Sequence, residues 1–142
     1  MDITVREARD EDADAIASLL GELGYPTNAT EVPARLATMR AEAGMWTIVA
    51  EADGQVVGMA TVIVRHVINN DAPFGRLASV VVADGWRSHG IGGRLIAEAE
   101  RICRDHGCFA MEVTSGTHRD RAHEFYRRLG YVDRPQRFIK TL

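Results

Sequence analysis

Apolar residues in the first half of the chain recur first at helical spacing and then in strand-like runs. Ile16, Leu19 and Leu23 fall three or four residues apart, the spacing of one face of an α-helix. Two later runs flank Asp53-Gly54, a dipeptide that favours a tight hairpin turn. The pattern predicts, in order, a strand at Thr4–Ala8, helices from Asp10 to Gly24 and from about Thr30 to Gly44, and a hairpin of strands Trp46–Glu51 and Val56–Val64.

The second half of the chain again alternates between strands and helices. Leu77–Val82 is apolar without alternation, which is typical of a strand covered on both faces. No repeat or Gly/Ser-rich linker interrupts the pattern, so we expect one domain over residues 1–142, with an α/β (α+β) fold. The remaining expected segments are a polar loop at Arg65–Gly75, a helix from Ile91 to Gly107, a strand at Phe109–Val113, a helix from Thr117 to Gly130 with a capping box at Thr117 and Asp120, and a terminal strand at Phe138–Leu142.

Charge and composition exclude several classes of protein. The formal net charge of −3 argues against a protein that binds nucleic acid by neutralising phosphates. No apolar run approaches the ~20 residues that span a bilayer, and Met1–Arg6 does not resemble a secretory signal, so we expect a cytoplasmic protein with no membrane partner. The spacing of Cys103 and Cys108 matches no metal or redox motif, so we interpret both as buried thiols and expect no metal.

A glycine-rich turn stands between the strand at Leu77–Val82 and the following helix. Gly90, Gly92 and Gly93 leave the backbone bare at a helix amino terminus, where unpaired N–H groups and the helix dipole favour an anion. Arg87, His89 and Arg94 add cationic side chains, which makes the turn a good pyrophosphate site. A Walker A loop is excluded because no lysine precedes Lys140; a turn whose glycines serve packing alone is the alternative.

Two motifs carry a resemblance to a known family. Arg87-Ser88-His89-Gly90-Ile91-Gly92 resembles the R/Q-x-x-G-x-G/A signature of GNAT acetyltransferases. The segment Ala122–Tyr131 is similar to the family's A-x-x-F-Y-x-x-x-G-F/Y block, and the element order matches along nearly the whole chain. The resemblance implies the GNAT acyltransferase fold, with a mixed, mostly antiparallel central sheet flanked by helices. It also implies acetyl-CoA as co-substrate.

The resemblance further implies which residues form the site. The strands at Leu77–Val82 and Phe109–Val113 should splay apart to admit the pantetheine arm, and the Tyr126 hydroxyl should protonate the leaving thiolate. The alternative is that Tyr126 is a core residue, since it shares a helix stripe with Leu129. The residues expected to bind the cofactor are Val80, Val82, Arg87, Ser88, His89, Gly90, Ile91, Gly92 and Gly93.

The general base and the acceptor stay open in the sequence. Many members of the family carry a glutamate where this chain has Ala78, so the alternatives for the base are Glu112, His66, Asp71 or a water chain. Arg119 stands where many members have asparagine, and its role is open.

We expect direct transfer of the acetyl group to a primary amine of a small molecule. The polar loop Arg65–Gly75, with Asn69 and Asp71, is expected to contact this acceptor. The alternatives are a protein or peptide N-acetyltransferase and a non-catalytic sensor that binds coenzyme A. A homodimer is compatible with the sequence.

Overall fold

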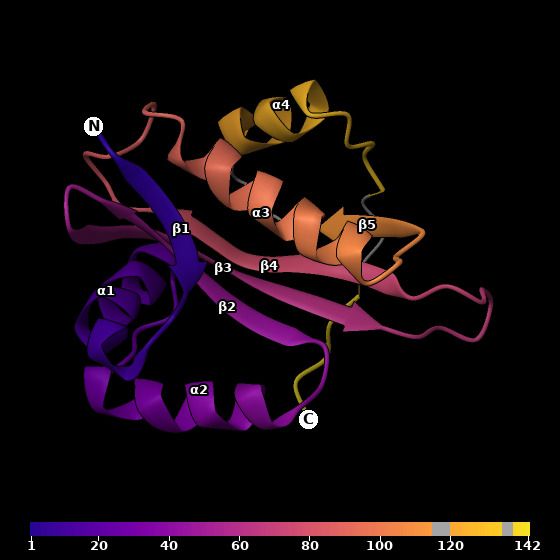
Figure 1. Cartoon of the computed structure of the whole chain (residues 1–142), viewed down its shortest axis with the longest axis horizontal. Helices are drawn as coiled ribbons and strands as arrows, with labels where there is room; N and C mark the ends of the chain where they lie inside the picture. Colours follow the sequence, from indigo (N-terminus) through magenta and orange to yellow (C-terminus); the bar gives the residue numbers. More distant parts are fainter. Residues whose placement is uncertain (115–119, 135–137) are drawn as a thin grey trace.

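The computed structural model describes residues 1–114, 120–134 and 138–142. Five strands and four α-helices follow one another in the order βααβββαβα, and two short 3-10 turns at Asp10–Asp12 and Ala29–Glu31 lead into the first two helices (Figure 1). The strands are β1 (Ile3–Glu7), β2 (Met45–Ala52), β3 (Gln55–Arg65), β4 (Phe74–Val82) and β5 (Ala110–Val113). The helices are α1 (Ala13–Leu23), α2 (Val32–Ala41), α3 (Ile91–Asp105) and α4 (Asp120–Arg128).

One sheet in the order β1-β2-β3-β4-β5 forms the centre of the molecule. Neighbouring strands are antiparallel except β4 and β5, which are parallel. Figure 1 shows α1 and α2 on one face of the sheet and α3 and α4 on the other. The predicted fold, a mixed and mostly antiparallel sheet flanked by helices, is therefore confirmed.

Alternation along the strands divides the core between the two faces of the sheet. Leu77 of β4 and Ile48 of β2 pack with the apolar stripe of α3, which includes Leu95 and Ile96. Val81 belongs instead to the cluster under α1 and α2. Neighbouring strand residues point to opposite faces. The side of β4 on which a residue lies therefore decides which helices it can contact.

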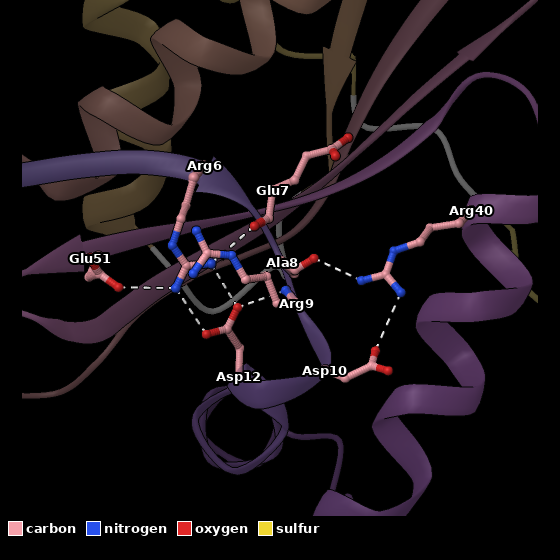
Figure 2. Close-up of polar contacts among 8 residues, drawn as sticks. All are labelled: Arg6, Glu7, Ala8, Arg9, Asp10, Asp12, Arg40 and Glu51. Atoms are coloured by element: carbon pink, nitrogen blue, oxygen red, sulfur yellow. Dashed lines mark hydrogen bonds and ion pairs between the residues drawn. The ribbon is translucent and has the colours of Figure 1, made fainter.

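A network of charged residues holds the first two helices against β1 and β2 (Figure 2). The Arg6 guanidinium on β1 donates to both carboxylate oxygens of Asp12, at 2.9 and 3.0 Å, and to Glu51 of β2 at 3.0 Å. Arg40 of α2 donates to the Ala8 carbonyl at 2.8 Å. Asp12 is only 7% exposed, and the Arg6 hydrogen bond holds its pKa below the usual value. Paired in this way, the buried carboxylate anchors the start of α1.

The structure corrects two details of the expected elements. β4 begins at Phe74 rather than Leu77, because residues 74–76 pair with β3 on one side and β5 on the other and so take strand geometry despite their polar neighbours. Residues 138–142 form no strand: Phe138, Ile139 and Leu142 are exposed and pair with no strand of the described chain. The capping box expected at Thr117 lies outside the described residues.

None of the helices in the described part of the chain combines the length and the apolar character needed to cross a membrane. The division into one domain over residues 1–142 stays a prediction.

Candidate active site

Strands β4 and β5 run side by side only along the first part of β4. Their parallel pairing extends from Phe74 with Ala110 to Leu77 with Val113. Residues Ala78–Val82 continue β4 without a strand partner on the β5 side in the described chain. An unpaired strand edge offers backbone N–H and C=O groups to an extended ligand. The described free edge matches an amide-bearing chain such as a pantetheine arm, and the expected parting of the two strands stays a prediction.

A β-bulge bends β4 where the pairing with β5 has just ended. Ala60 of β3 alone lies opposite two residues of β4, Ser79 and Val80, because the register shifts there by one residue. Ser79 has a φ of 54°, in the left-handed region that residues with a side chain seldom occupy. A bulge of this kind leaves one residue unpaired and turns the strand. The bulge therefore places a local bend in β4 directly after the residues that pair with β5.

The glycine-rich turn presents bare backbone at the start of α3. Gly90 is the N-cap residue with a φ of 78°, and no side chain caps the helix. A Cβ atom at Gly90 would meet no atom within 4 Å, so the space above the turn is open. Uncapped N–H groups at a helix amino terminus and the helix dipole both favour an anion. The described residues therefore fit the pyrophosphate of a coenzyme A that enters along β4.

Hydrogen bonds and ion pairs fix the cationic side chains of this turn. Arg87 donates through Nε to the Val82 carbonyl at 3.3 Å and lies 3.7 Å from Glu22 of α1. The same Glu22 accepts a hydrogen bond from the Asp84 amide at 2.8 Å, which ties the turn to α1. The exposed His89 ring lies within hydrogen-bond distance of the Arg87 carbonyl, 2.8 Å from Nδ1. Arg87 and His89 thus stay beside the turn.

Arg94, the third cation expected at the turn, is directed elsewhere. Its guanidinium donates to the Ile3 carbonyl of β1 at 2.9 Å. The side chain of Ile91 is likewise taken up by the core, with an exposure of 1%, so this residue can offer a ligand only its backbone. The Ile3 carbonyl therefore holds one nitrogen of the Arg94 guanidinium, and the contribution of its charge to an anion site stays a prediction.

Helix α4 places an aromatic side chain over the first turn of α3. A Cβ atom at Gly92 would lie 3.7 Å from the Phe125 ring and 3.9 Å from Val82, and one at Gly93 would lie 4.0 Å from Phe125. These distances are ordinary van der Waals contacts. The structure thus brings together the end of β4, the glycine turn and the start of the second motif, which the sequence could connect only by resemblance.

Tyr126 lies beside Phe125 on α4, half-buried against the core cluster that α3 helps to form. Its ring is 5.8 Å from the Phe125 ring and 6.2 Å from that of Tyr131, centroid to centroid. The Tyr131 hydroxyl donates to Glu100 of α3 at 2.8 Å, and the Tyr131 amide donates to the Tyr126 carbonyl at 3.0 Å. Tyr131 therefore fastens the end of α4 to α3. The role of Tyr126 as a proton donor stays a prediction.

The alternatives for the general base lie at different places in the structure. Ala78 and Glu112 lie on the sheet face opposite α3, because Leu77 and Val113, their chain neighbours, pack toward α3. His66 is exposed near the tip of the β3–β4 hairpin, and Asp71 helps to line a shallow hollow of about 410 Å³ at this tip. Figure 1 shows this hairpin tip at the end of the sheet away from the start of α3. Glu112 is therefore closer along the sheet to the parting of β4 and β5.

The two cysteines are free thiols near the end of α3. Cys103 is buried as expected, whereas Cys108 is only partly buried. Burial, reinforced by the neighbouring Cys108, raises the pKa of Cys103 to about 12. Since the thiolate is the nucleophilic form, this thiol is poorly suited to carry an acetyl group. Among the described residues, no group of three or more His, Cys, Asp or Glu side chains is arranged to hold a metal ion.

Sequence reasoning missed three features of this site. They are the bulge at Ser79, the tether from Glu22 to the Asp84 amide, and the anchor from Tyr131 to Glu100. Tyr131 carried a signal, since an apolar residue directly after a helix-ending glycine often packs back on its helix. No local signal marks the other two, because both depend on which segments the fold brings together. Arg119 lies outside the described residues.

Comparison with known proteins assigns a family. The model of the Acetyltransferase (GNAT) family matches residues 13–131. An aminoglycoside N(6′)-acetyltransferase type 1 of Stenotrophomonas maltophilia is 33% identical over 134 residues, 92% of this chain and 86% of that protein. A probable glucosamine 6-phosphate N-acetyltransferase of Drosophila melanogaster is 30% identical over 137 residues, and the match spans 92% of this chain but only 61% of that protein.

Solved structures give the same result. An acetyltransferase of Trypanosoma brucei aligns with a TM-score of 0.83 at 27% identity, covering 99% of this chain and 100% of the other. The family match covers the glycine-rich turn and α4, which contain the two motifs on which the resemblance was based. The chain therefore belongs to the GNAT family and is an acetyl-CoA-dependent acyltransferase.

Proposed function

We propose that the chain transfers the acetyl group of acetyl-CoA directly to a primary amine of a small molecule. The observation that carries the proposal is the edge of β4 at Ala78–Val82, which pairs with no strand of the described chain on the β5 side. It leads to a helix start at Gly90 that no described side chain caps. A backbone edge followed by an anion site fits a ligand with an amide-bearing arm and a pyrophosphate.

Each part of the site has a role in this proposal. The backbone at Gly90, Ile91, Gly92 and Gly93 would hold the pyrophosphate, with Arg87, Ser88 and His89 around it, while Val80 and Val82 would line the arm. The bound cofactor supplies an activated acetyl thioester. The acceptor nitrogen forms the new C–N bond as the C–S bond breaks, and Tyr126 donates a proton to the departing sulfur. The amine loses its own proton to a base or to water.

Direct transfer is favoured over a covalent acetyl-enzyme. Cys103 is 3% exposed and its pKa is raised by burial, so its thiolate is scarce at neutral pH. Cys108 lies beside it near the far end of α3 from the glycine turn. Neither cysteine is placed on the unpaired part of β4. The amine can therefore take the acetyl group without an intermediate on the chain.

The named relatives support a small acceptor. The Stenotrophomonas and Drosophila proteins are named for an aminoglycoside and for glucosamine 6-phosphate, both small amino compounds. A peptide acceptor and a non-catalytic sensor are the two competing functions. The retained Tyr126 argues against the sensor, because a protein that only binds coenzyme A needs no proton donor at the thioester sulfur.

A release assay separates these functions. The full chain is incubated with acetyl-CoA and a panel of aminosugars, aminoalkyl compounds and peptides, and free coenzyme A is measured with a thiol reagent. We expect small amines to stimulate release more than peptides do. Release with peptides alone would establish the second function, and binding of acetyl-CoA without release would establish the sensor. Cytoplasmic location, a homodimer and the absence of nucleic-acid partners stay predictions.

A further inference from the structure

The guanidinium of Arg76 on β4 has a hydrogen-bond donor without an acceptor in the described chain. Its Nε is buried, and no hydrogen-bond partner for this atom exists among the described residues. The nearest carboxylate oxygen, Oε1 of Glu112 on the paired strand β5, lies 3.6 Å away, which makes an ion pair but not a hydrogen bond. A buried donor without an acceptor costs free energy, so the position of this side chain needs another explanation.

The face on which Arg76 lies is the face away from α3. Gly75 and Leu77, its neighbours in the chain, both contact α3-side residues, and a Cβ atom at Gly75 would collide with the Cys103 sulfur. Alternation therefore puts Arg76 on the same side as Ala78, two residues further along β4. Because α1 contacts the later part of β4 and α2 packs on β2, this end of the face is not covered by α1 or α2.

Arg76 lies two to three residues along β4 from Ala78 and Ser79, where the proposed acetyl transfer takes place. The described pairing of β4 with β5 ends at Leu77, and the proposed function places the acetyl thioester beside the residues that follow, Ala78 and Ser79. Two residues of strand correspond to about 6.6 Å. The ion pair with Glu112 directs the guanidinium toward β5 rather than along β4 toward Ala78. An acceptor nitrogen at the gap is thus separated from Arg76 by several bond lengths.

The Arg76 side chain is suited to bind an anionic group. A guanidinium presents a planar set of five N–H donors that matches the oxygens of phosphate or carboxylate. The Arg76 side chain is 38% exposed, so its outer nitrogens are accessible while Nε is not. The carboxylate carbon of an α-amino acid lies only two bonds from the nitrogen, about 2.5 Å, so a longer amino compound with an anionic group at its far end fits this separation better. A phosphate or phosphonate at that end offers three oxygens and up to two negative charges to the guanidinium.

We propose that Arg76 binds a phosphate or phosphonate group on the acceptor, which makes amines with a distant phosphoryl group the preferred substrates. This inference rests on the proposed acetyltransferase function and names the acceptor class for the same site. Glu112 has two effects in this arrangement. Its carboxylate holds the Arg76 guanidinium in place, and its negative charge repels the incoming phosphoryl group. Arg76 is a specificity-determining residue, and Glu112 limits the strength of the preference.

Matched pairs of acceptors test the proposal. The ratio of kcat/KM for glucosamine 6-phosphate to that for glucosamine is measured, and likewise for 3-aminopropylphosphonate and propylamine. We expect the wild-type protein to favour the phosphoryl-bearing member of each pair at least tenfold. Arg76→Gln should lower this ratio at least tenfold, and Arg76→Lys, which keeps the charge but loses the planar fork, should lower it less.

Several results would overturn the inference. A wild-type ratio near one or a ratio unchanged in Arg76→Gln would each do so. Turnover of amines with no preference for a phosphoryl group would contradict this inference and leave the proposed function standing. The absence of turnover with every amine would contradict both the inference and the proposed function. Calorimetric affinity for coenzyme A, measured on each variant, shows that the cofactor site is intact, so a lowered ratio cannot be attributed to misfolding.

Discussion

Replacing Gly92 with glutamate adds one negative charge to the first turn of α3, where the pyrophosphate is expected. A Cβ atom is tolerated at this position, since it makes only ordinary contacts with Phe125 and Val82. A carboxylate about 6 Å from a group with two negative charges costs about 0.7 kcal/mol per charge in water, roughly 1.4 kcal/mol in total. This corresponds to about a tenfold loss of affinity for coenzyme A.

The same substitution should not weaken the free protein. An acidic residue in the first turn interacts favourably with the helix dipole, typically by ~0.3–1 kcal/mol, and glutamate has a higher helix propensity than glycine. Gly92→Glu should therefore raise the melting temperature of the unliganded chain while lowering cofactor affinity. Opposite changes in these two quantities distinguish an anion site from a glycine that serves packing alone.

Titration calorimetry at two salt concentrations is the assay, with Gly92→Gln as the control of equal size and no charge. We expect Gly92→Gln to bind coenzyme A more tightly than Gly92→Glu, and the difference to shrink as salt screens the repulsion. Gly92→Ala reports the effect of the Cβ atom alone. Equal affinities for the Glu and Gln variants at low salt would refute the electrostatic reasoning and move the pyrophosphate away from this turn.

Three further predictions concern the acid, the packing of β4 and the charged anchor of α1. Tyr126→Phe should lower kcat about 100-fold, the low end for general acid catalysis, with unchanged calorimetric affinity for coenzyme A; unaltered turnover would make Tyr126 a core residue. Gly75→Ala puts a Cβ atom 2.5 Å from the Cys103 sulfur and should lower the free energy of unfolding in urea by about 1–3 kcal/mol. The double variant with Cys103→Ala should recover this stability. An unchanged stability of Gly75→Ala would mean that α3 moves away from β4 at no cost. Arg6 lowers the pKa of Asp12 in the folded state, so the ion pair stabilises the fold fully above the ordinary pKa of 3.8, and this stabilisation disappears as pH falls through the lower folded pKa. Asp12→Asn should therefore make the urea midpoint less dependent on pH in acid. An unchanged acid dependence would contradict the pairing.

Local sequence signals were sufficient where a short segment dictates its own conformation. Asp53 and Gly54 both adopt positive φ, 51° and 79°, and join β2 to β3 as the dipeptide predicted. Gly24 likewise ends α1 in the left-handed conformation with a φ of 102°. These features depend on backbone sterics within a few residues, which a sequence displays directly.

Features that depend on distant partners could not be read in this way. The hydrogen bond from the Arg94 guanidinium to the Ile3 carbonyl joins residues 91 positions apart, so no local pattern predicted it. Phe74 looked like part of a polar loop, although pairing with Arg65 and Ala110 makes it the first residue of β4. The location of Arg76 opposite Glu112 also follows from strand register, which only the assembled sheet determines.

The bulge at Ser79 separates stability from activity at a single residue. Ala78 lies on the face away from α3, whereas Val80 packs on the α3 side and Val81 on the α1 side. If Ser79 were deleted, Ala78, Val80 and Val81 would alternate without a break and every core side chain would keep its face. The shortened strand would also lose a residue in a strained conformation. Deletion of this one codon would therefore give a more regular sheet, and the bend that follows the pairing with β5 would be lost with it. If the proposed cofactor site is formed by this bend, the deletion should raise stability and abolish turnover together.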